Sequence, residues 1–176
     1  MSKIKVVDIA SIGLKVDKPS LENLMSVGKE LSAAFEEIGF VFVSNHGVDE
    51  NIIKNAKDSS LDYFKLGSEV KGVKEKGSEP NVYQGWVKPG KEIFDQDEKG
   101  LIASLELRES YDMNDFGPTG YFPDEHVPSF RPSMTSLAEN AKLLTFRILK
   151  CLSVVLGQEE DFLGDLHKLE DAMKMR

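Results

Sequence analysis

Residues 39–50, GFVFVSNHGVDE, decide how this chain begins to fold. The four residues at 40–43 are all apolar and lack the alternation that is typical of a half-exposed strand. A strand that is apolar on both faces usually lies in the interior of a sheet. The turn that follows contains His46 and Gly47, and glycine suits a turn that needs a positive φ. We therefore predict a central, buried strand over residues 40–43 that turns directly into a helix.

His46 has two interpretations, a metal ligand or catalytic base on one side and a turn residue on the other. The iron site of non-haem oxygenases needs two histidines and one carboxylate. In its usual form the histidine and the aspartate stand two residues apart, whereas Asp49 lies three residues after His46. Asp49 also fits the N-cap of the next helix, with Val48 and Ile53 placed as a hydrophobic staple. The residues therefore favour a structural His46.

The elements around this stretch indicate an α+β protein. Residues 4–9 read as a strand rich in β-branched side chains. A helix is predicted between Ser20 as N-cap and Gly39 as C-terminal stop, and a second helix after Asp49. The longest helix is predicted over residues 133–156. The order of elements is not a regular alternation of strands and helices, so a parallel doubly wound sheet is not predicted.

The segment LELRESYDM, residues 105–113, alternates strictly and predicts a half-buried strand. Tyr111 and Glu109 fall on its apolar row, together with Leu107. A carboxylate on a buried row must find a partner. Arg108 points to the opposite face, so a partner for Glu109 must come from elsewhere. We interpret Glu109 either as a member of a salt bridge or as a strand-end carboxylate in water.

Composition limits the possible partners and compartments. The chain has 176 residues, 40% of them hydrophobic and 30% charged, which predicts a single globular domain over residues 1–176. The net charge of −8 disfavours duplex nucleic acid and anionic membranes as partners. The sequence shows no apolar run long enough to span a bilayer, no signal-peptide pattern and a single cysteine. These features predict a cytoplasmic protein.

The remaining candidates for a metal ligand or a nucleophile have little support in the sequence. His126 lies between carboxylates in a proline-rich loop and is expected to be solvated. Cys151 lies in the apolar run of a helix, so we expect a packed thiol rather than a nucleophile. His167 with Asp165 and Asp171 is the best metal-ligand cluster in the sequence, but it needs further ligands that no segment obviously offers. A metal hydrolase built on these three residues is the last of our hypotheses.

The order of motifs resembles that of a known family. The motifs are LSAAFEEIGFVFVSNHGV, then NVYQGWVKPG, then LELRESYDM, and then a P-x-F-R element that leads into a long helix ending VLG. Over residues 5–165 this order is similar to the N-terminal region of the iron(II)/2-oxoglutarate-dependent dioxygenases of the isopenicillin N synthase-like group. The resemblance implies a helical region with a few strands that belong to an incomplete double-stranded β-helix, or jelly roll. It also implies that the catalytic half of the β-helix is largely absent from this chain.

The resemblance implies no catalytic and no metal-binding residue here. In the family, the His-x-Asp and distant His that hold iron, and the Arg-x-Ser that holds 2-oxoglutarate, all lie C-terminal to residue 176. This sequence has no His-x-Asp, and Arg-Pro-Ser at 131–133 falls in the matched P-x-F-R element, so we interpret its letters as a coincidence. Fe(II) and 2-oxoglutarate are expected in the complete enzyme and not on this chain. Tyr83 and Tyr111 match positions near the substrate in relatives, although both are equally well explained as core aromatic residues.

Two functions follow as hypotheses. The first is the N-terminal portion of a 2-oxoglutarate-dependent oxygenase that acts on a small organic substrate and is not catalytically competent alone. The alternative is a short, non-catalytic interaction module that pairs with a full-length relative. Such pairing would use an uncovered face of a sheet.

Overall fold

The computed structural model describes residues 3–73, 84–91, 107–117, 120–167 and 174–176. These residues form two compact units. Unit 1 comprises Met1–Ile53 and Leu137–Asp171, and unit 2 comprises Lys54–Ser136 and Ala172–Arg176. The described elements are helices and short strands, which confirms the predicted α+β class.

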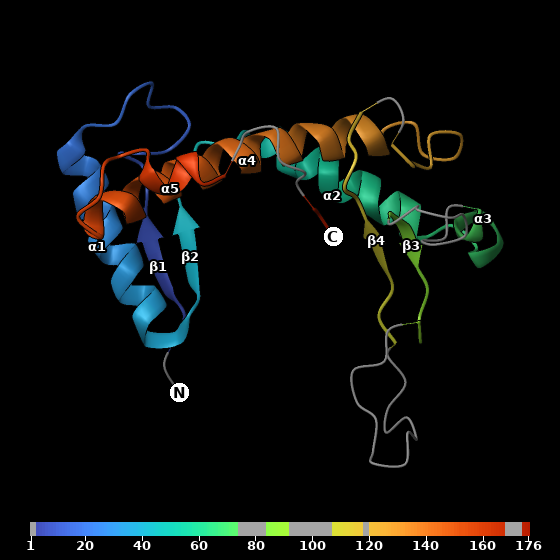
Figure 1. Cartoon of the computed structure of the whole chain (residues 1–176). Helices are drawn as coiled ribbons and strands as arrows, with labels where there is room; N and C mark the ends of the chain where they lie inside the picture. Colours follow the sequence, from blue (N-terminus) through green and yellow to red (C-terminus); the bar gives the residue numbers. More distant parts are fainter. Residues whose placement is uncertain (1–2, 74–83, 92–106, 118–119, 168–173) are drawn as a thin grey trace, which may run out of the picture. The chain divides into compact units, whose positions relative to one another are not determined.

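A two-stranded parallel sheet forms the start of unit 1. Strand β1 (Lys5–Asp8) pairs with β2 (Val41–Ser44), so that Val7 lies opposite Val43. Helix α1 (Leu21–Ile38) connects them and covers one face of the sheet (Figure 1). The predicted order of strand, helix and strand is confirmed in this part of the chain.

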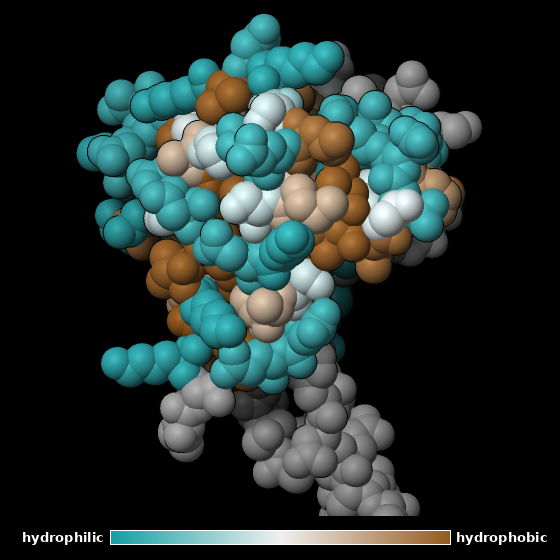
Figure 2. All heavy atoms as spheres, turned by 90° about the vertical axis from the view of Figure 1, so that its left-hand side faces the viewer, coloured by the Kyte–Doolittle hydropathy of each residue, from teal (hydrophilic) through white to brown (hydrophobic). Residues whose placement is uncertain are grey.

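Helix α1 begins and ends where its capping residues predict. The Ser20 hydroxyl accepts a hydrogen bond from the Asn23 backbone N–H, and Gly39 takes a φ of 77° at the C-terminal end. The buried stripe consists of Leu24, Val27, Gly28, Leu31 and Ala34. Between these positions the helix exposes mostly charged side chains, and hydrophilic residues cover much of this face of the molecule, with hydrophobic patches between them (Figure 2).

The prediction that the strand at 40–43 is buried on both faces is wrong for the described structure. Val41 and Val43 pack against the core of unit 1, whereas Phe40 and Phe42 are 69% and 58% exposed. The reason is that α1 covers only one face of the sheet. No other described element packs on the opposite face.

The turn after β2 explains the Asn-His-Gly letters at 45–47. Asn45 adopts a φ of 56°, and its side-chain amide donates to the Asp8 carboxylate at 2.9 Å. His46 accepts at Nδ1 from the Val48 backbone N–H, and its carbonyl accepts from the Leu14 N–H at 2.9 Å. Gly47 has a φ of 82°, and an added Cβ would lie 2.7 Å from the Leu14 nitrogen. His46 therefore belongs to a tight turn, as predicted.

The core of unit 1 lies between the sheet, α1 and the C-terminal part of helix α4 (Phe130–Val155). Its fully buried members are Val7, Ile9, Ile12, Leu24, Val27, Leu31, Cys151 and Val154. Helix α4 begins three residues earlier than predicted, because Pro132 is tolerated in the first turn of a helix. Within the described ranges no helix, α4 included, combines the length and the apolarity that crossing a membrane requires.

Unit 2 is built from most of helix α2 (Glu50–Phe64), the short helix α3 (Ser68–Gly72) and a small antiparallel sheet. Asp49 caps α2 as predicted, and its carboxylate accepts from the Asn51 N–H at 2.7 Å. Strand β3 (Gly85–Val87) pairs with β4 (Ser110–Asp112), and Trp86 lies opposite Tyr111. Short helix α5 (Phe162–Asp165) follows α4 in unit 1.

The predicted strand at 105–113 is only partly found. Residues 105 and 106 lie outside the described residues, and strand structure covers Ser110–Asp112. Tyr111 and Met113 are buried as predicted, but so is Asp112, and Leu107 is 80% exposed. Asp112 can be buried because Arg176 contacts its carboxylate with two nitrogens, at 2.5 and 2.9 Å. A strictly alternating sequence therefore gives a strand that is buried on both faces.

Gly28→Ala should lower the free energy of unfolding by about 1–3 kcal/mol, as overpacking of a core does. An added Cβ would lie 2.5 Å from both the Cys151 carbonyl oxygen and Cγ2 of Val155. Gly72→Ala is the matched control, because a Cβ there meets nothing within 4 Å and it should not lower the stability. Urea denaturation of the three proteins measures the effect. Equal stability of the two variants would show that α1 and α4 do not approach closely at Gly28.

Candidate functional site

Four aromatic side chains form the centre of unit 2. Tyr63 of α2 contacts Tyr111 of β4 edge to face, with ring centroids 5.0 Å apart. Phe130 at the start of α4 lies 5.2 Å from Tyr63 and 5.3 Å from Tyr111. Phe122 completes the cluster, 6.2 Å from Phe130. All four are buried, and such geometries are the favourable ones for aromatic pairs.

A buried ion pair lies in the same unit. The Lys71 ammonium donates to both Glu109 carboxylate oxygens, at 3.0 and 2.8 Å, and the Trp86 indole N–H donates to the same carboxylate at 2.7 Å. The Lys71 side chain is 6% exposed and that of Glu109 is 27% exposed. Lys71 also lies over the Trp86 ring, 5.3 Å from its centroid. Of the two interpretations given for Glu109, the structure shows the salt bridge, and the partner stands 38 residues away in the sequence.

The hydroxyl of Tyr63 is buried and has no hydrogen-bond partner among the described residues. Burial raises the pKa of Tyr63 well above its usual range, and the nearby Tyr111 and Glu109 raise it further. The phenol therefore stays protonated. An unpaired buried hydroxyl costs free energy, so it can donate to a water or another polar group that enters the unit.

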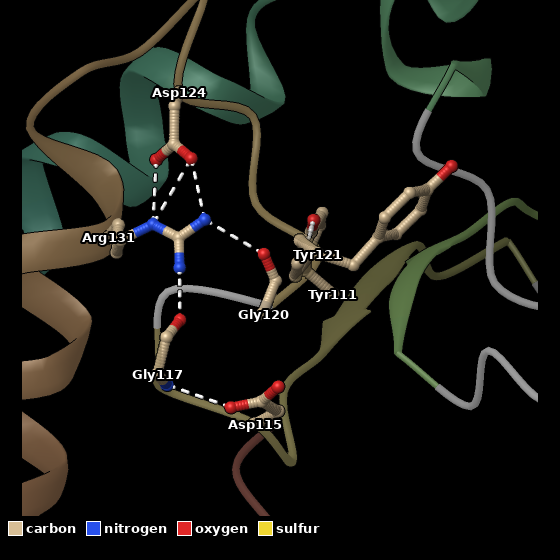
Figure 3. Close-up of polar contacts among 7 residues, drawn as sticks. All are labelled: Tyr111, Asp115, Gly117, Gly120, Tyr121, Asp124 and Arg131. Carbon is tan, nitrogen blue, oxygen red and sulfur yellow. Dashed lines mark hydrogen bonds and ion pairs between the residues drawn. The ribbon is translucent and has the colours of Figure 1, made fainter.

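Arg131 holds the loop before α4 together (Figure 3). Its guanidinium contacts both oxygens of Asp124 and donates to the carbonyls of Gly117 and Gly120 at 2.5 and 2.8 Å. It also lies over the Phe122 ring, 4.4 Å from its centroid. The hydrogen bonds to Asp124 raise the pKa of Arg131 above its ordinary value. These contacts give Arg131 a structural role in this loop, in line with our interpretation of Arg-Pro-Ser as a coincidence.

The two residues predicted to lie near a substrate have different outcomes. Tyr83 lies outside the described residues. Tyr111 is 2% exposed, and its hydroxyl donates to the Tyr121 carbonyl at 2.5 Å (Figure 3). Tyr121 in turn donates to the Val73 carbonyl at 2.6 Å. Burial raises the pKa of Tyr111 well above its usual range. A contact of either tyrosine with a substrate stays a prediction.

The other candidates are dispersed. His126 is exposed, and burial raises the pKa of the Cys151 thiol to about 11, as expected for a packed cysteine. His167 and Asp165 both line a cavity of about 850 Å³ in unit 1, while Asp171 lies outside the described residues. In the part of the chain that is described, no three His, Cys, Asp or Glu side chains come together to hold a metal. The hydrolase hypothesis stays an untested prediction.

The cavity in unit 1 has an apolar wall and largely paired charges. Leu143 and Phe146 of α4 contribute to the wall. Arg147 donates through one nitrogen to the Val16 and Asp17 carbonyls, at 2.9 and 2.8 Å. Lys150 contacts Glu160 and Asp161; burial lowers its pKa, but these hydrogen bonds outweigh burial and leave the pKa raised. Lys150 and Nη2 of Arg147 therefore hold neighbouring segments, whereas Nη1 of Arg147 is buried and has no hydrogen-bond partner among the described residues.

Glu109→Gln should lower the free energy of unfolding by about 2 kcal/mol or more, because it leaves the Lys71 charge buried without a carboxylate. The double variant with Lys71→Met should recover part of this loss, since both charges are then gone. Lys54→Met is the control, because Lys54 pairs with Asp58 at the surface and should contribute little. Thermal and urea unfolding are measured for the wild type, both single variants Glu109→Gln and Lys71→Met, the double variant and Lys54→Met. A fully additive double variant would contradict the pairing.

Arg131→Lys should destabilise unit 2 by about 1–3 kcal/mol, because an ammonium cannot serve the carboxylate and both carbonyls together. Asp124→Asn should lose a similar amount, and the two losses should not add, since the residues share one network. Unfolding monitored by tryptophan fluorescence reports on the unit that contains Trp86. If Arg131→Lys leaves the stability unchanged, the structural role of Arg131 is contradicted. The guanidinium of the wild-type protein would then be available to a ligand.

Known proteins share this sequence and fold. The family model described as "non-haem dioxygenase in morphine synthesis N-terminal" matches residues 4–133. A homoarginine-6-hydroxylase of Oryza sativa subsp. japonica is 32% identical over 170 residues, which is 90% of this chain and 50% of the relative. The 2-oxoglutarate-dependent dioxygenase frbA of Dothideomycetidae sp. is 26% identical over 146 residues, or 77% of this chain and 43% of the relative.

Solved structures agree with this match at the level of the fold. A 2OG-Fe(II) oxygenase family protein from Caulobacter crescentus superimposes with a TM-score of 0.69 at 22% identity, over 93% of this chain and 52% of that chain. The dioxygenase for auxin oxidation in rice gives a TM-score of 0.58 at 19% identity, over 88% of this chain and 46% of that chain. The chain thus spans about half the length of the relatives it matches. Because the family model covers most of the sequence, this chain belongs to the family of 2-oxoglutarate-dependent, non-haem iron dioxygenases and corresponds to their N-terminal region.

Proposed function

We propose that this chain is the N-terminal portion of an Fe(II)/2-oxoglutarate-dependent oxygenase that acts on a small organic substrate. The observation that carries the proposal is the match of residues 4–133 to the N-terminal family model, in a chain that spans about half of its relatives. Several relatives are named for small molecules, among them the rice homoarginine-6-hydroxylase and the proline hydroxylase buaE of Petromyces alliaceus. A small organic substrate for the complete enzyme is inferred from these names.

The chain is proposed to be inactive by itself. The described residues do not supply a fitting iron site, since no cluster of three potential ligands is found among them. Arg131 begins the Arg-Pro-Ser letters that match the 2-oxoglutarate motif of the family. Its guanidinium is bonded to Asp124 and to two backbone carbonyls. Fe(II) and 2-oxoglutarate would supply the oxidising chemistry in the complete enzyme, and no step of that chemistry is assigned to residues of this chain.

The contribution of unit 2 to the complete enzyme would be to place Tyr111. The proposal treats β3 and β4 as strands of an incomplete jelly roll, which agrees with their antiparallel pairing. Glu109, which pairs with Lys71, directly precedes β4, and the Tyr111 ring contacts the rings of Tyr63 and Phe122. Tyr83 and Tyr111 are proposed to border the substrate in that assembly.

A second candidate function is a short, non-catalytic module that pairs with a full-length relative. The observation in its favour is the uncovered face of the β1–β2 sheet, on which Val6 and Phe42 are exposed. Both candidates are expected to act in the cytoplasm. The first candidate requires a protein in the source cells that is larger than this chain, whereas the second requires a protein of the same size. The size of the protein therefore decides between them.

The size of the protein in its source cells tests the proposal first. An antibody raised against residues 130–165 should detect one band well above the 19.6 kDa of this chain. The isolated chain, supplied with Fe(II), ascorbate and 2-oxoglutarate, should form no succinate above the rate without protein. A band at 19.6 kDa would favour the interaction module. Succinate formation by the isolated chain would refute the proposal that this chain is inactive by itself.

A further inference from the structure

The cavity in unit 1 combines an apolar wall with a basic side chain that is only partly bonded. Its lining residues all belong to this unit and come from the turn at Gly47, the start of α2, the second half of α4 and the region of α5. The apolar part of the wall consists of Leu14, Ile52, Leu143 and Phe146. A volume of about 850 Å³ is typical of small-molecule sites, which are mostly apolar with a few placed polar groups. The cavity is therefore large enough for a small organic ligand.

Arg147 is a polar group of this wall whose hydrogen bonding is incomplete. One terminal nitrogen, Nη2, donates to the Val16 and Asp17 carbonyls at 2.9 and 2.8 Å, which holds the guanidinium in place. The other terminal nitrogen, Nη1, is buried and has no hydrogen-bond partner among the described residues. A buried donor without an acceptor costs free energy, and the cost is larger for a charged group. An acceptor supplied by a ligand at Nη1 would remove this cost.

The positive charge of Arg147 favours an anionic acceptor. Both acceptors of Nη2 are neutral backbone carbonyls, and Arg147 forms no ion pair within the described part of the chain. Lys150, which also lines the cavity, differs because its ammonium contacts Glu160 at 2.7 Å and Asp161 at 2.5 Å. Hydrogen bonds from a guanidinium to a carboxylate are stronger than those between neutral groups. Arg147 therefore favours a carboxylate over an amide or a hydroxyl.

The acidic residues of the wall limit the charge of the ligand. Three aspartates and two basic residues line the cavity, so the wall carries a net charge of −1 when His167 is neutral. One of these aspartates, Asp165, is exposed on α5. A ligand with a single carboxylate can pair with Arg147, whereas each further negative charge would be repelled by the aspartates. The rest of the ligand should be apolar, to match Leu143 and Phe146.

We propose that this cavity binds a small monocarboxylate with an apolar body, whose carboxylate accepts a hydrogen bond from Nη1 of Arg147. The apolar body would lie against Leu143 and Phe146, where burial of its surface adds to the affinity. Binding at this site involves no reaction step and does not depend on the oxygenase function proposed above. A water molecule is the alternative partner of Nη1, because water can satisfy buried polar groups in the same way.

Octanoate is the probe for this site, because it joins one carboxylate to an apolar chain, and octanamide is its neutral counterpart. Isothermal titration calorimetry of the 176-residue chain should show one octanoate bound per chain. Its dissociation constant should be about tenfold or more below that of octanamide, and Arg147→Met should raise it by about tenfold or more. Lys142→Met is the matched control, because it removes a positive charge from α4 at a residue that does not line the cavity. The control should bind octanoate as the wild type does.

Gly164→Leu tests the cavity without altering Arg147. Gly164 lines the cavity, and an added Cβ would lie 3.5 Å from Cδ1 of Phe146, in ordinary contact. The larger leucine side chain should therefore take up space that the ligand needs and weaken octanoate binding by about tenfold or more. Circular dichroism verifies that each variant folds. If Arg147→Met fails to fold, Gly164→Leu and the comparison of octanoate with octanamide decide the question.

The outcomes separate this site from non-specific binding. Octanoate binding that is weakened in Arg147→Met and Gly164→Leu, and unchanged in Lys142→Met, supports the proposal. Absence of octanoate binding at millimolar concentration overturns it and leaves water as the partner of Nη1. Equal affinity for octanamide overturns the role of the carboxylate, and unchanged binding in Gly164→Leu places the probe elsewhere on the chain. Equal weakening in Lys142→Met would show that octanoate responds only to the net charge, which also overturns the proposal.

Discussion

The backbones of α1 and α4 approach so closely in unit 1 that only a glycine fits between them. At Gly28 a single added methyl group would overlap the Cys151 carbonyl and the Val155 side chain. This approach lets Leu24, Leu31 and Cys151 exclude solvent completely. It also fixes which face of the β1–β2 sheet is covered, because Val7 and Val43 can reach this core only from one side. The openness of the other face is thus a consequence of how the core is closed.

Unit 2 depends on a different kind of constraint, the pairing of buried charges. Lys71, Asp112 and Arg131 would each be costly in an apolar interior, and each has an oppositely charged partner with close geometry. Two of the partners come from distant parts of the sequence, 38 residues away for Lys71 and 64 for Asp112, whereas Arg131 pairs with Asp124 seven residues before it. Hydrophobic burial alone would tolerate several arrangements of the four rings, whereas directional pairs select one. The buried Tyr63 hydroxyl is an exception, because it has no hydrogen-bond partner among the described residues.

Local signals in the sequence predicted local structure well. Ser20, Gly39 and Asp49 mark helix ends because capping needs only neighbouring residues, and the same holds for the turn at His46 and Gly47. Contacts between distant residues could not be predicted in this way. The buried row suggested that Glu109 has a partner, but nothing in a single sequence identifies Lys71. The prediction that the strand at 40–43 is buried on both faces was wrong for a related reason. An apolar run shows that a strand can be buried, but it does not show which helices or sheets are present to cover it. For the candidate site, a family pattern rather than periodicity singled out Tyr111, and only the structure reveals that its hydroxyl is engaged with Tyr121.

The distribution of polar and apolar contacts bears on what this chain can contribute to an enzyme. Arg131, Lys150 and Glu109 could each take part in binding or proton transfer, yet each is engaged in holding two segments of the chain together. The described residues also leave apolar side chains exposed, above all Phe40 and Phe42. A region that performs chemistry keeps polar groups available at a pocket, whereas a region that supports a neighbour satisfies its polar groups and leaves hydrophobic surface to be covered. The described residues that share the fold of oxygenases thus use Arg131, Lys150 and Glu109 to hold segments of the chain together.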